Sequence, residues 1–129
     1  MRVAEYLAAP RPAWDWVHLD CCRWVARWVE LCGRQNPITA LGLDYATERQ
    51  AIALIVRRGG LVQLWTDGMA LVGAPETAGL TPGCVGIIQR PTICGLNEAA
   101  AIYTGERWAA LGLRGQEFMP APVLKAWRP

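Results

Sequence analysis

The stretch HLDCCRWVARWVELCG (residues 18–33) decides the first half of the fold. Apolar side chains recur in it with the period of one helical face, which predicts an amphipathic helix. Asp20 stands directly before the first apolar position as an N-cap, and Gly33 supplies a stop. The predicted helix therefore begins after Asp20 and buries the face formed by Cys21, Val25, Trp28, Val29 and Cys32.

The arginines of this stretch fall outside the apolar face. Arg23 and Arg27, with the neighbouring tryptophans, have the composition of a surface that stacks bases and binds phosphate. A row of arginines on a helix is more often a solvated face, and Glu30 is placed to reach Arg34 one turn later. We therefore interpret the row as solvent-facing.

The N-terminal segment before the helix is rich in proline. In PRPAWDW (residues 10–16) each proline fixes its own φ and disfavours helix at the preceding residue, so we expect residues 1–16 to form an extended lead-in. The segment MRVAEYLAAP (residues 1–10) lacks the continuous apolar run of a signal peptide. We therefore expect the protein to be made and to fold in the cytosol.

A second helix follows a connecting stretch. Thr47 and Gln50 have the spacing of a capping box, and they predict a helix through residues 48–58 that ends at Gly59-Gly60. Beyond residue 60 the apolar runs become short and are separated by turn residues, which predicts a small antiparallel sheet. The expected strands are LVQLW (61–65), ALVGA (70–74), CVGIIQ (84–89) and either TICGL (92–96) or AAIYT (100–104), with APVLKAWRP (121–129) as a strand or a short helix.

Helices followed by a sheet indicate the α+β class, and a chain of 129 residues suits a single domain over residues 1–129. The formal net charge of +2 is too small to bind nucleic acid or anionic membranes through charge alone. No segment approaches the roughly 20 apolar residues of a membrane span. The sequence therefore favours partners that are recognised by shape.

Tryptophan is the conspicuous residue type, with seven copies against one phenylalanine. Trp is large and amphipathic, so some of these indoles are candidates for a protein interface. Trp14, Trp16 and Trp127 lie near the termini and are the interface candidates. The alternative, that all seven line the core or a pocket, has equal weight because half-buried Trp is ordinary in monomers.

Cys21 is the candidate nucleophile because a thiol in the first turn of a helix meets unpaired N–H groups that favour the thiolate. A nucleophile also needs a base, and His18 is the only imidazole in the chain. From three residues upstream it would have to curl back over the helix start. A packed thiol at Cys21, with Cys22 as the exposed member of the pair, is the simpler interpretation.

The odd count of five cysteines, without a secretory signal, indicates reduced and mostly buried thiols. A zinc site would have to combine His18, Cys21 or Cys22, Cys84 and Cys94. Adjacent cysteines and a gap of nine residues fit the usual ligand spacing poorly. We therefore expect no metal and no cofactor.

Short motifs along the chain carry a family resemblance. They are Asp20-Cys21 before an aromatic-rich helix, GGL (59–61), PGCVGII (82–88) and TICGL (92–96). In this order they resemble the NlpC-type papain-like fold. Within that clan the chain is most similar to a small domain of unknown function encoded among phage tail genes. The resemblance implies a papain-like α+β domain.

The resemblance also implies roles for particular positions. The clan's nucleophile is the cysteine after Asp at the helix start, which matches Cys21. Cys84, in Pro82-Gly83-Cys84, stands where the clan has an acid. The base is a histidine just before the next strand, and the nearest match, residues 90–94, contains none. Because a general base is commonly worth about 10²–10⁴-fold in rate, the resemblance implies a hydrolase fold with a broken catalytic pair.

We therefore expect a non-enzymatic structural component of a bacteriophage tail tip or baseplate. It would be assembled in the host cytoplasm into a multi-subunit virion part and would contact other tail proteins. The alternative is a cysteine peptidase or amidase acting on peptidoglycan, with Cys21 as nucleophile and His18 or a water-linked acid as base. A zinc-stabilised interaction module is the third possibility.

Overall fold

The central helix α2 (Cys21–Leu31) begins where the sequence predicts it. In the computed structural model, which describes all residues except 1, 10–13, 17–18 and 92–95, the Asp20 side chain accepts a hydrogen bond from the Arg23 backbone N–H at 2.9 Å and so caps the helix. Gly33 follows the last turn with a φ of +98°, a conformation that glycine adopts without strain. Both predicted boundaries are confirmed.

The other helices are short. The Thr47 side chain caps α4 by accepting from the Gln50 backbone N–H at 3.2 Å, while the Gln50 side chain accepts from the Ala46 backbone N–H at 2.7 Å. The capping box is thus confirmed, with its return bond shifted by one residue. The remaining bounds are α1 (Val3–Ala8), α3 (Pro37–Ala40), α4 (Glu48–Arg57) and α5 (Leu61–Leu71).

Helix α5 corrects the prediction that the sheet starts after residue 60. Its residues Leu61, Leu64, Trp65 and Met69 are at most 3% exposed and recur with helical spacing. The run LVQLW is therefore helical, and ALVGA contributes only its first residues to α5. A short apolar run does not distinguish a buried strand from a buried helix, which is why the local pattern misleads here.

Helix α1 corrects the expected extended lead-in over residues 1–16. Its Tyr6 is buried against α2, with ring centroids 5.4 Å from Trp24, and its hydroxyl donates to the Trp24 carbonyl at 2.6 Å. Residues 3–8 precede the first proline, so nothing in that segment breaks a helix.

The sheet has five strands in the order β4-β3-β2-β1-β5, and all neighbours are antiparallel. The run AAIYT is part of β2, whereas most of TICGL lies outside the described residues. The C-terminal segment forms an edge strand. The predicted α+β order of helices followed by an antiparallel sheet is confirmed, with β1 (Val85–Gln89), β2 (Glu98–Tyr103), β3 (Trp108–Gly112), β4 (Gly115–Met119) and β5 (Val123–Trp127).

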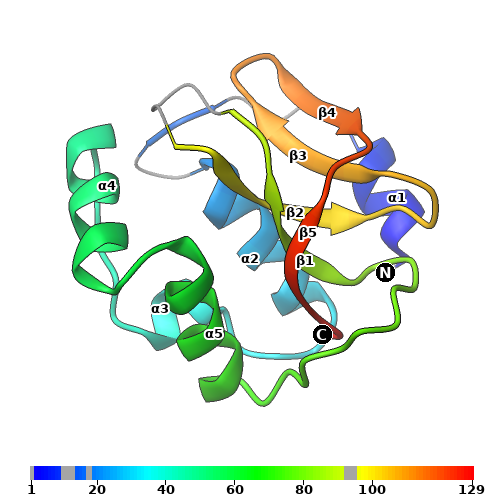
Figure 1. Cartoon of the computed structure of the whole chain (residues 1–129), viewed down its shortest axis with the longest axis horizontal. Helices are drawn as coiled ribbons and strands as arrows, with labels where there is room; N and C mark the ends of the chain where they lie inside the picture. Colours follow the sequence, from blue (N-terminus) through cyan, green and yellow to red (C-terminus); the bar gives the residue numbers. More distant parts are fainter. Residues whose placement is uncertain (1, 10–13, 17–18, 92–95) are drawn as a thin grey trace.

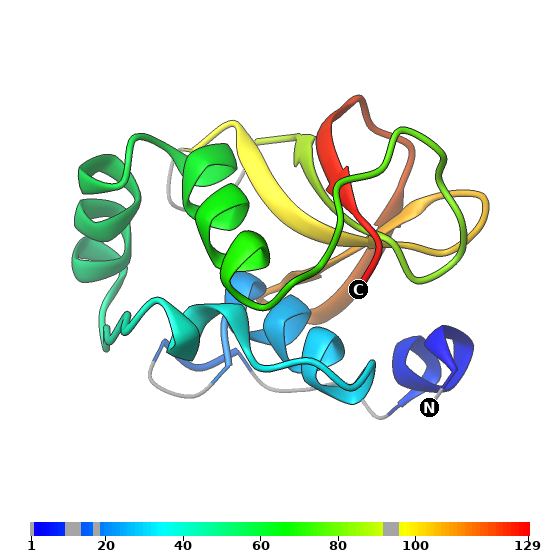
Figure 2. The same ribbon diagram turned by 90° about the horizontal axis from the view of Figure 1, so that it is seen from below.

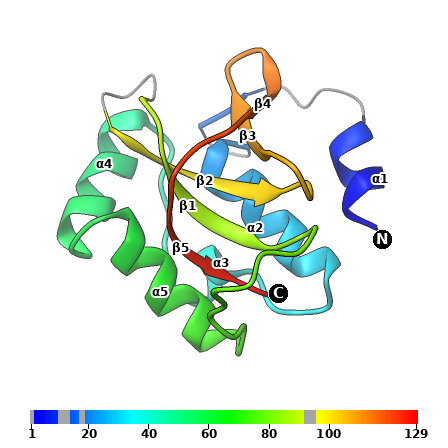
Figure 3. The same ribbon diagram turned by 45° about the vertical axis from the view of Figure 1, so that its right-hand side comes forward.

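Helix α2 packs on β2 and β3, and α5 contacts β5 on the same side of the sheet (Figures 1 and 2). Helix α4 lies at the outer end of this layer, next to α5 and away from the sheet, as Figure 3 also shows. Alternate residues of β2 belong to two clusters. Ala100 and Ile102 join the main core with α2, while Ala99 and Ala101 join a smaller cluster around Trp108.

Among the described residues, no helix is long and apolar enough to cross a membrane.

The second cluster depends on a glycine. An added Cβ at Gly86 would lie 2.5 Å from Cη2 of Trp108, a side chain that is itself 3% exposed. We expect Gly86→Ala to lower the free energy of unfolding by about 1–3 kcal/mol because the ring has no room to move. Urea denaturation measures this. In the control Gly79→Ala, where the nearest atom would be 4.0 Å away, an equal loss would contradict the explanation.

Candidate functional site

Cys21 occupies the first turn of α2 and is half-buried between two spaces. One is a cavity of about 40 Å³ beneath it, called here the inner cavity. The other is a hollow of about 490 Å³ at the ends of the strands, called here the sheet-side hollow. Cys21 lines both, so its thiol lies at the junction of the helical layer and the sheet. The inner cavity is lined mainly by aliphatic side chains, among them Ile38, Leu43, Leu54, Ile55, Leu61 and Leu64.

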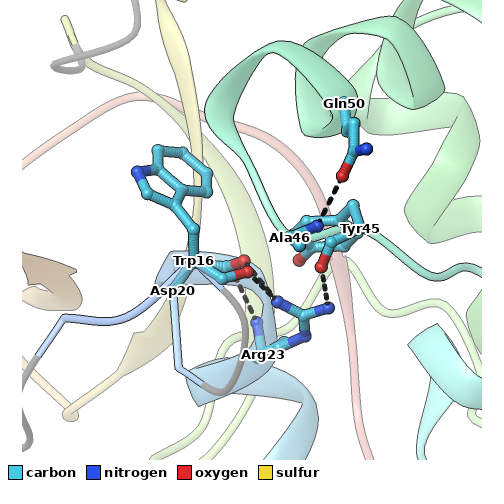
Figure 4. A network of polar contacts seen from close by, with 6 residues as sticks. All are labelled: Trp16, Asp20, Arg23, Tyr45, Ala46 and Gln50. Atoms are coloured by element: carbon cyan, nitrogen blue, oxygen red, sulfur yellow. Dashed lines mark hydrogen bonds and ion pairs between the residues drawn. The ribbon is translucent and has the colours of Figure 1, made fainter.

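A buried ion pair holds this helix start in place. Asp20 is 1% exposed, and its Oδ2 lies 3.4 Å from an Arg23 guanidinium nitrogen. The same guanidinium donates to the backbone carbonyl of Trp16 and, at 2.7 Å, to that of Tyr45 (Figure 4). It also lies over the Tyr45 ring, 3.8 Å from the centroid. The solvent-facing interpretation is therefore wrong for Arg23, which joins three segments of the chain.

Burial raises the pKa of Asp20, against the lowering effects of a hydrogen bond from the Tyr45 side chain and of the Arg23 backbone N–H. The pKa of Tyr45 is also raised, first by burial. Asp20 thus retains a cost of desolvation in its charged form, although each of its hydrogen bonds favours that form. The interactions at the helix start compensate this cost only in part.

Cys22 is buried, so the expectation that it is the exposed member of the pair is wrong. Its pKa is raised well above the usual value, first by its hydrogen bond with the Cys21 thiol and then by burial. Cys22 therefore remains a protonated thiol, placed to donate to the sulfur of Cys21. One step along a helix turns a side chain by about 100°, and here that step points Cys22 into the core.

The sheet supplies few chemical groups to Cys21. The sheet residues that line the sheet-side hollow with Cys21 include Ala99, Ala110 and Leu111, which have no proton acceptor in their side chains. Glu117 of β4 also lines it, and its carboxylate is paired with Arg90 at 2.7 Å. Across the inner cavity the β2 residue is Glu98. Of the residues 90–94, where the resemblance places the base, Arg90 lines the hollow and residues 92–94 lie outside the described part. His18 also lies outside it.

The proposed zinc ligands are not brought together in the described part of the chain. Asp20, Cys21 and Cys22 have ligand atoms within 4.8 Å of one another, but Cys84 is not in this group. Cys84 is 1% exposed, and its sulfur accepts from the Thr81 backbone N–H at 3.4 Å. Cys94 lies outside the described residues. With Asp20 already used as the helix cap, this cluster is a poor match to a structural zinc site.

The interface candidates differ in exposure. Trp127 is 2% exposed in the core, so the interface role predicted for it is not compatible with this packing. Trp14 and Trp16 are half-buried and meet edge to face, with ring centroids 5.1 Å apart. Of the three candidates, Trp14 and Trp16 retain surface for a partner. Arg90 and Arg114, which line the sheet-side hollow with Trp14 and Cys21, were not predicted, because no local sequence pattern indicates that these residues meet.

The fold and the site define a small α+β protein in which a half-buried cysteine begins the helix that packs on the sheet. Residues 1–129 match the family described as a domain of unknown function, DUF6950, and the chain belongs to that family. No curated protein matches significantly, and no solved structure does.

The raised pKa of Asp20 gives a pH dependence of known sign. An aspartate has a pKa near 3.9 in an unfolded chain. Because the pKa of Asp20 is higher in the folded protein, the folded state keeps this proton at pH values where the unfolded chain has lost it. Its contribution to stability is therefore full at low pH and is lost as the pH rises through the folded-state pKa. We expect Asp20→Asn, which keeps a cap acceptor, to remove this decline.

The measurement is the free energy of unfolding in urea from about pH 4 to 8, taken as the difference between wild type and variant. Glu106→Gln, at an exposed turn, is the matched control. The prediction is contradicted if the free energy of unfolding of wild type relative to Asp20→Asn stays constant, or increases, as the pH rises. Either result would show that burial is not the dominant influence on the pKa of Asp20.

Proposed function

We propose that this protein is a non-enzymatic structural component of a bacteriophage tail tip or baseplate. On this proposal its fold is of the papain-like NlpC type and has lost its catalytic pair. The resemblance of the motifs around Cys21 supports the assignment. The observed order, with a cysteine at the start of a helix that packs on an antiparallel sheet, is compatible with it.

The observation that carries the proposal is the set of groups around Cys21. Thiol catalysis needs a base within hydrogen-bond reach, usually an imidazole. Among the described sheet residues, those that line the hollow with Cys21 include Ala99, Ala110, Leu111 and Glu117, and Glu98 lines the inner cavity. The Glu117 carboxylate is already paired with Arg90 at 2.7 Å. A carboxylate side chain is not the imidazole that thiol catalysis usually uses, so neither glutamate supplies the expected base.

A structural role requires surface for neighbours, and the sheet end supplies some. Large apolar side chains are exposed on β4, on β5 and in the turn before β4. On the proposal, other tail proteins cover these residues in the virion, after synthesis and assembly in the host cytoplasm. The residues are Leu113, Phe118, Val123 and Leu124, each 38–57% exposed.

One observation favours the second candidate, a cysteine peptidase or amidase that cuts peptidoglycan. Cys21 is half-exposed, opens onto a hollow of about 490 Å³ and is hydrogen-bonded to the protonated thiol of Cys22. In that case Cys21 is the nucleophile, and His18 or Glu98, acting through water, is the base.

The test is release of soluble fragments from purified peptidoglycan sacculi, together with complementation of a phage that lacks this gene. We expect no release above buffer, and we expect Cys21→Ser to support infectious particles as well as wild type. Cys32→Ser, at an exposed position, is the matched control. Release of fragments that Cys21→Ser abolishes would contradict the proposal, and loss of release in Glu98→Gln would then identify the base.

A further inference from the structure

We propose that the sheet-side hollow binds a short segment of a partner tail protein in which a carboxylate side chain stands next to an apolar one. This inference rests on the proposed structural role and identifies the chemistry of the partner. It is carried by the charges at the rim of the hollow, by its apolar walls and by its size.

The rim has an unpaired cation. Arg114, in the β3–β4 turn, is exposed and has no hydrogen-bond or ion-pair partner among the described residues. Arg90, which also lines the hollow, donates to Glu117 Oε2 at 2.7 Å and contacts the Met119 sulfur at 3.8 Å. Among the described residues, the one carboxylate that lines the hollow is therefore already paired. One guanidinium remains for an incoming anion, and a carboxylate is the geometric match for it.

The walls are apolar. Trp14, Ala99, Ala110 and Leu111 contribute apolar side chains to the lining. Leu113, which is 57% exposed, extends this surface outward beside Arg114. An aliphatic side chain next to the carboxylate would cover these groups and remove their apolar surface from water, which favours binding.

The size selects a segment rather than a single atom or ion. A volume of about 490 Å³ lies within the usual range of roughly 300–1,000 Å³ for ligand sites. The inner cavity, at about 40 Å³, has no such capacity. A nucleic acid is a poor match because the whole chain carries only +2 and its backbone would need a row of cations.

The probe is an acetylated and amidated tetrapeptide of alternating Leu and Glu, compared with the same peptide carrying Gln in place of Glu. Binding is followed by ¹H–¹⁵N NMR on the full chain, using the indole N–H signal of Trp14, assigned with Trp14→Phe. We expect the Glu peptide to shift this signal saturably and the Gln peptide to bind about three- to tenfold more weakly, since the ion pair with the exposed Arg114 is lost.

Arg114→Gln should lower the affinity for the Glu peptide about three- to tenfold. The loss is modest because the guanidinium is solvent-exposed and its charge is partly screened. Arg107→Gln, in the β2–β3 turn away from the hollow, is the matched control and should leave binding unchanged. Equal effects of the two substitutions, equal binding of the two peptides, or no Trp14 shift up to about 5 mM peptide would each overturn the inference.

A peptidoglycan stem peptide carries carboxylates too, so L-Ala-γ-D-Glu-diaminopimelate is tested alongside. Binding of this peptide without binding of the Leu-Glu peptide would overturn the partner assignment. The sacculus assay reports on the proposed function separately. If the protein releases no fragments from sacculi and also does not bind the Leu-Glu peptide, the proposed structural role stands and only this inference is overturned.

Discussion

The contact between Asp20 and Arg23 is the interaction on which the rest of the site depends. One carboxylate, almost without solvent exposure, caps α2 and pairs with a guanidinium that also holds the backbone at Trp16 and Tyr45. The segment before the helix, the helix itself and the loop before α4 are thereby joined. Because a buried charge without partners is expensive, these contacts must form together. The position of Cys21 follows from them.

Once α2 is fixed, the sheet determines what Cys21 meets. The pairing of β2 with β1 and β3 brings Ala99, Ala110 and Leu111 to the hollow and Glu98 to the inner cavity. Cys22, turned inward, retains its proton and contributes packing and a hydrogen bond to the neighbouring sulfur. A helix start that is typical of a nucleophile thus faces a wall with little capacity for proton transfer. This arrangement is the basis for our proposal that the protein works by binding through the rim and the exposed strands.

Local sequence signals were enough to predict the helices that begin after a side chain capable of capping the first turn. Asp20 and Thr47 predict the starts of α2 and α4 because their side chains satisfy the free N–H groups of a first turn. Helix α5 was not recognised, because its core-facing leucines and Trp65 form a run that is equally compatible with a strand. The short helix α1 was not predicted, because the prolines that follow it favoured an extended segment over residues 1–16.

The site was predictable only in part. The N-cap and the candidate thiol come from adjacent residues, but the partners of Arg23 lie 7 and 22 residues away. The meeting of Trp14, Arg90 and Arg114 depends on strand register and on the β3–β4 turn, which no local pattern encodes. Trp127 illustrates the same limit, since its place near the terminus says nothing of the core that covers it.

The central claim is that Cys21 is a half-buried thiol with no activating base among the described residues around it. Its most direct test is the rate of iodoacetamide alkylation of Cys21 in the folded protein, compared by peptide mapping with exposed Cys32 of the same chain. The account predicts that Cys21 reacts no faster than Cys32. Reaction of Cys21 more than about tenfold faster than Cys32 near pH 6, where ordinary thiols are protonated, would show an activated thiolate and contradict the account.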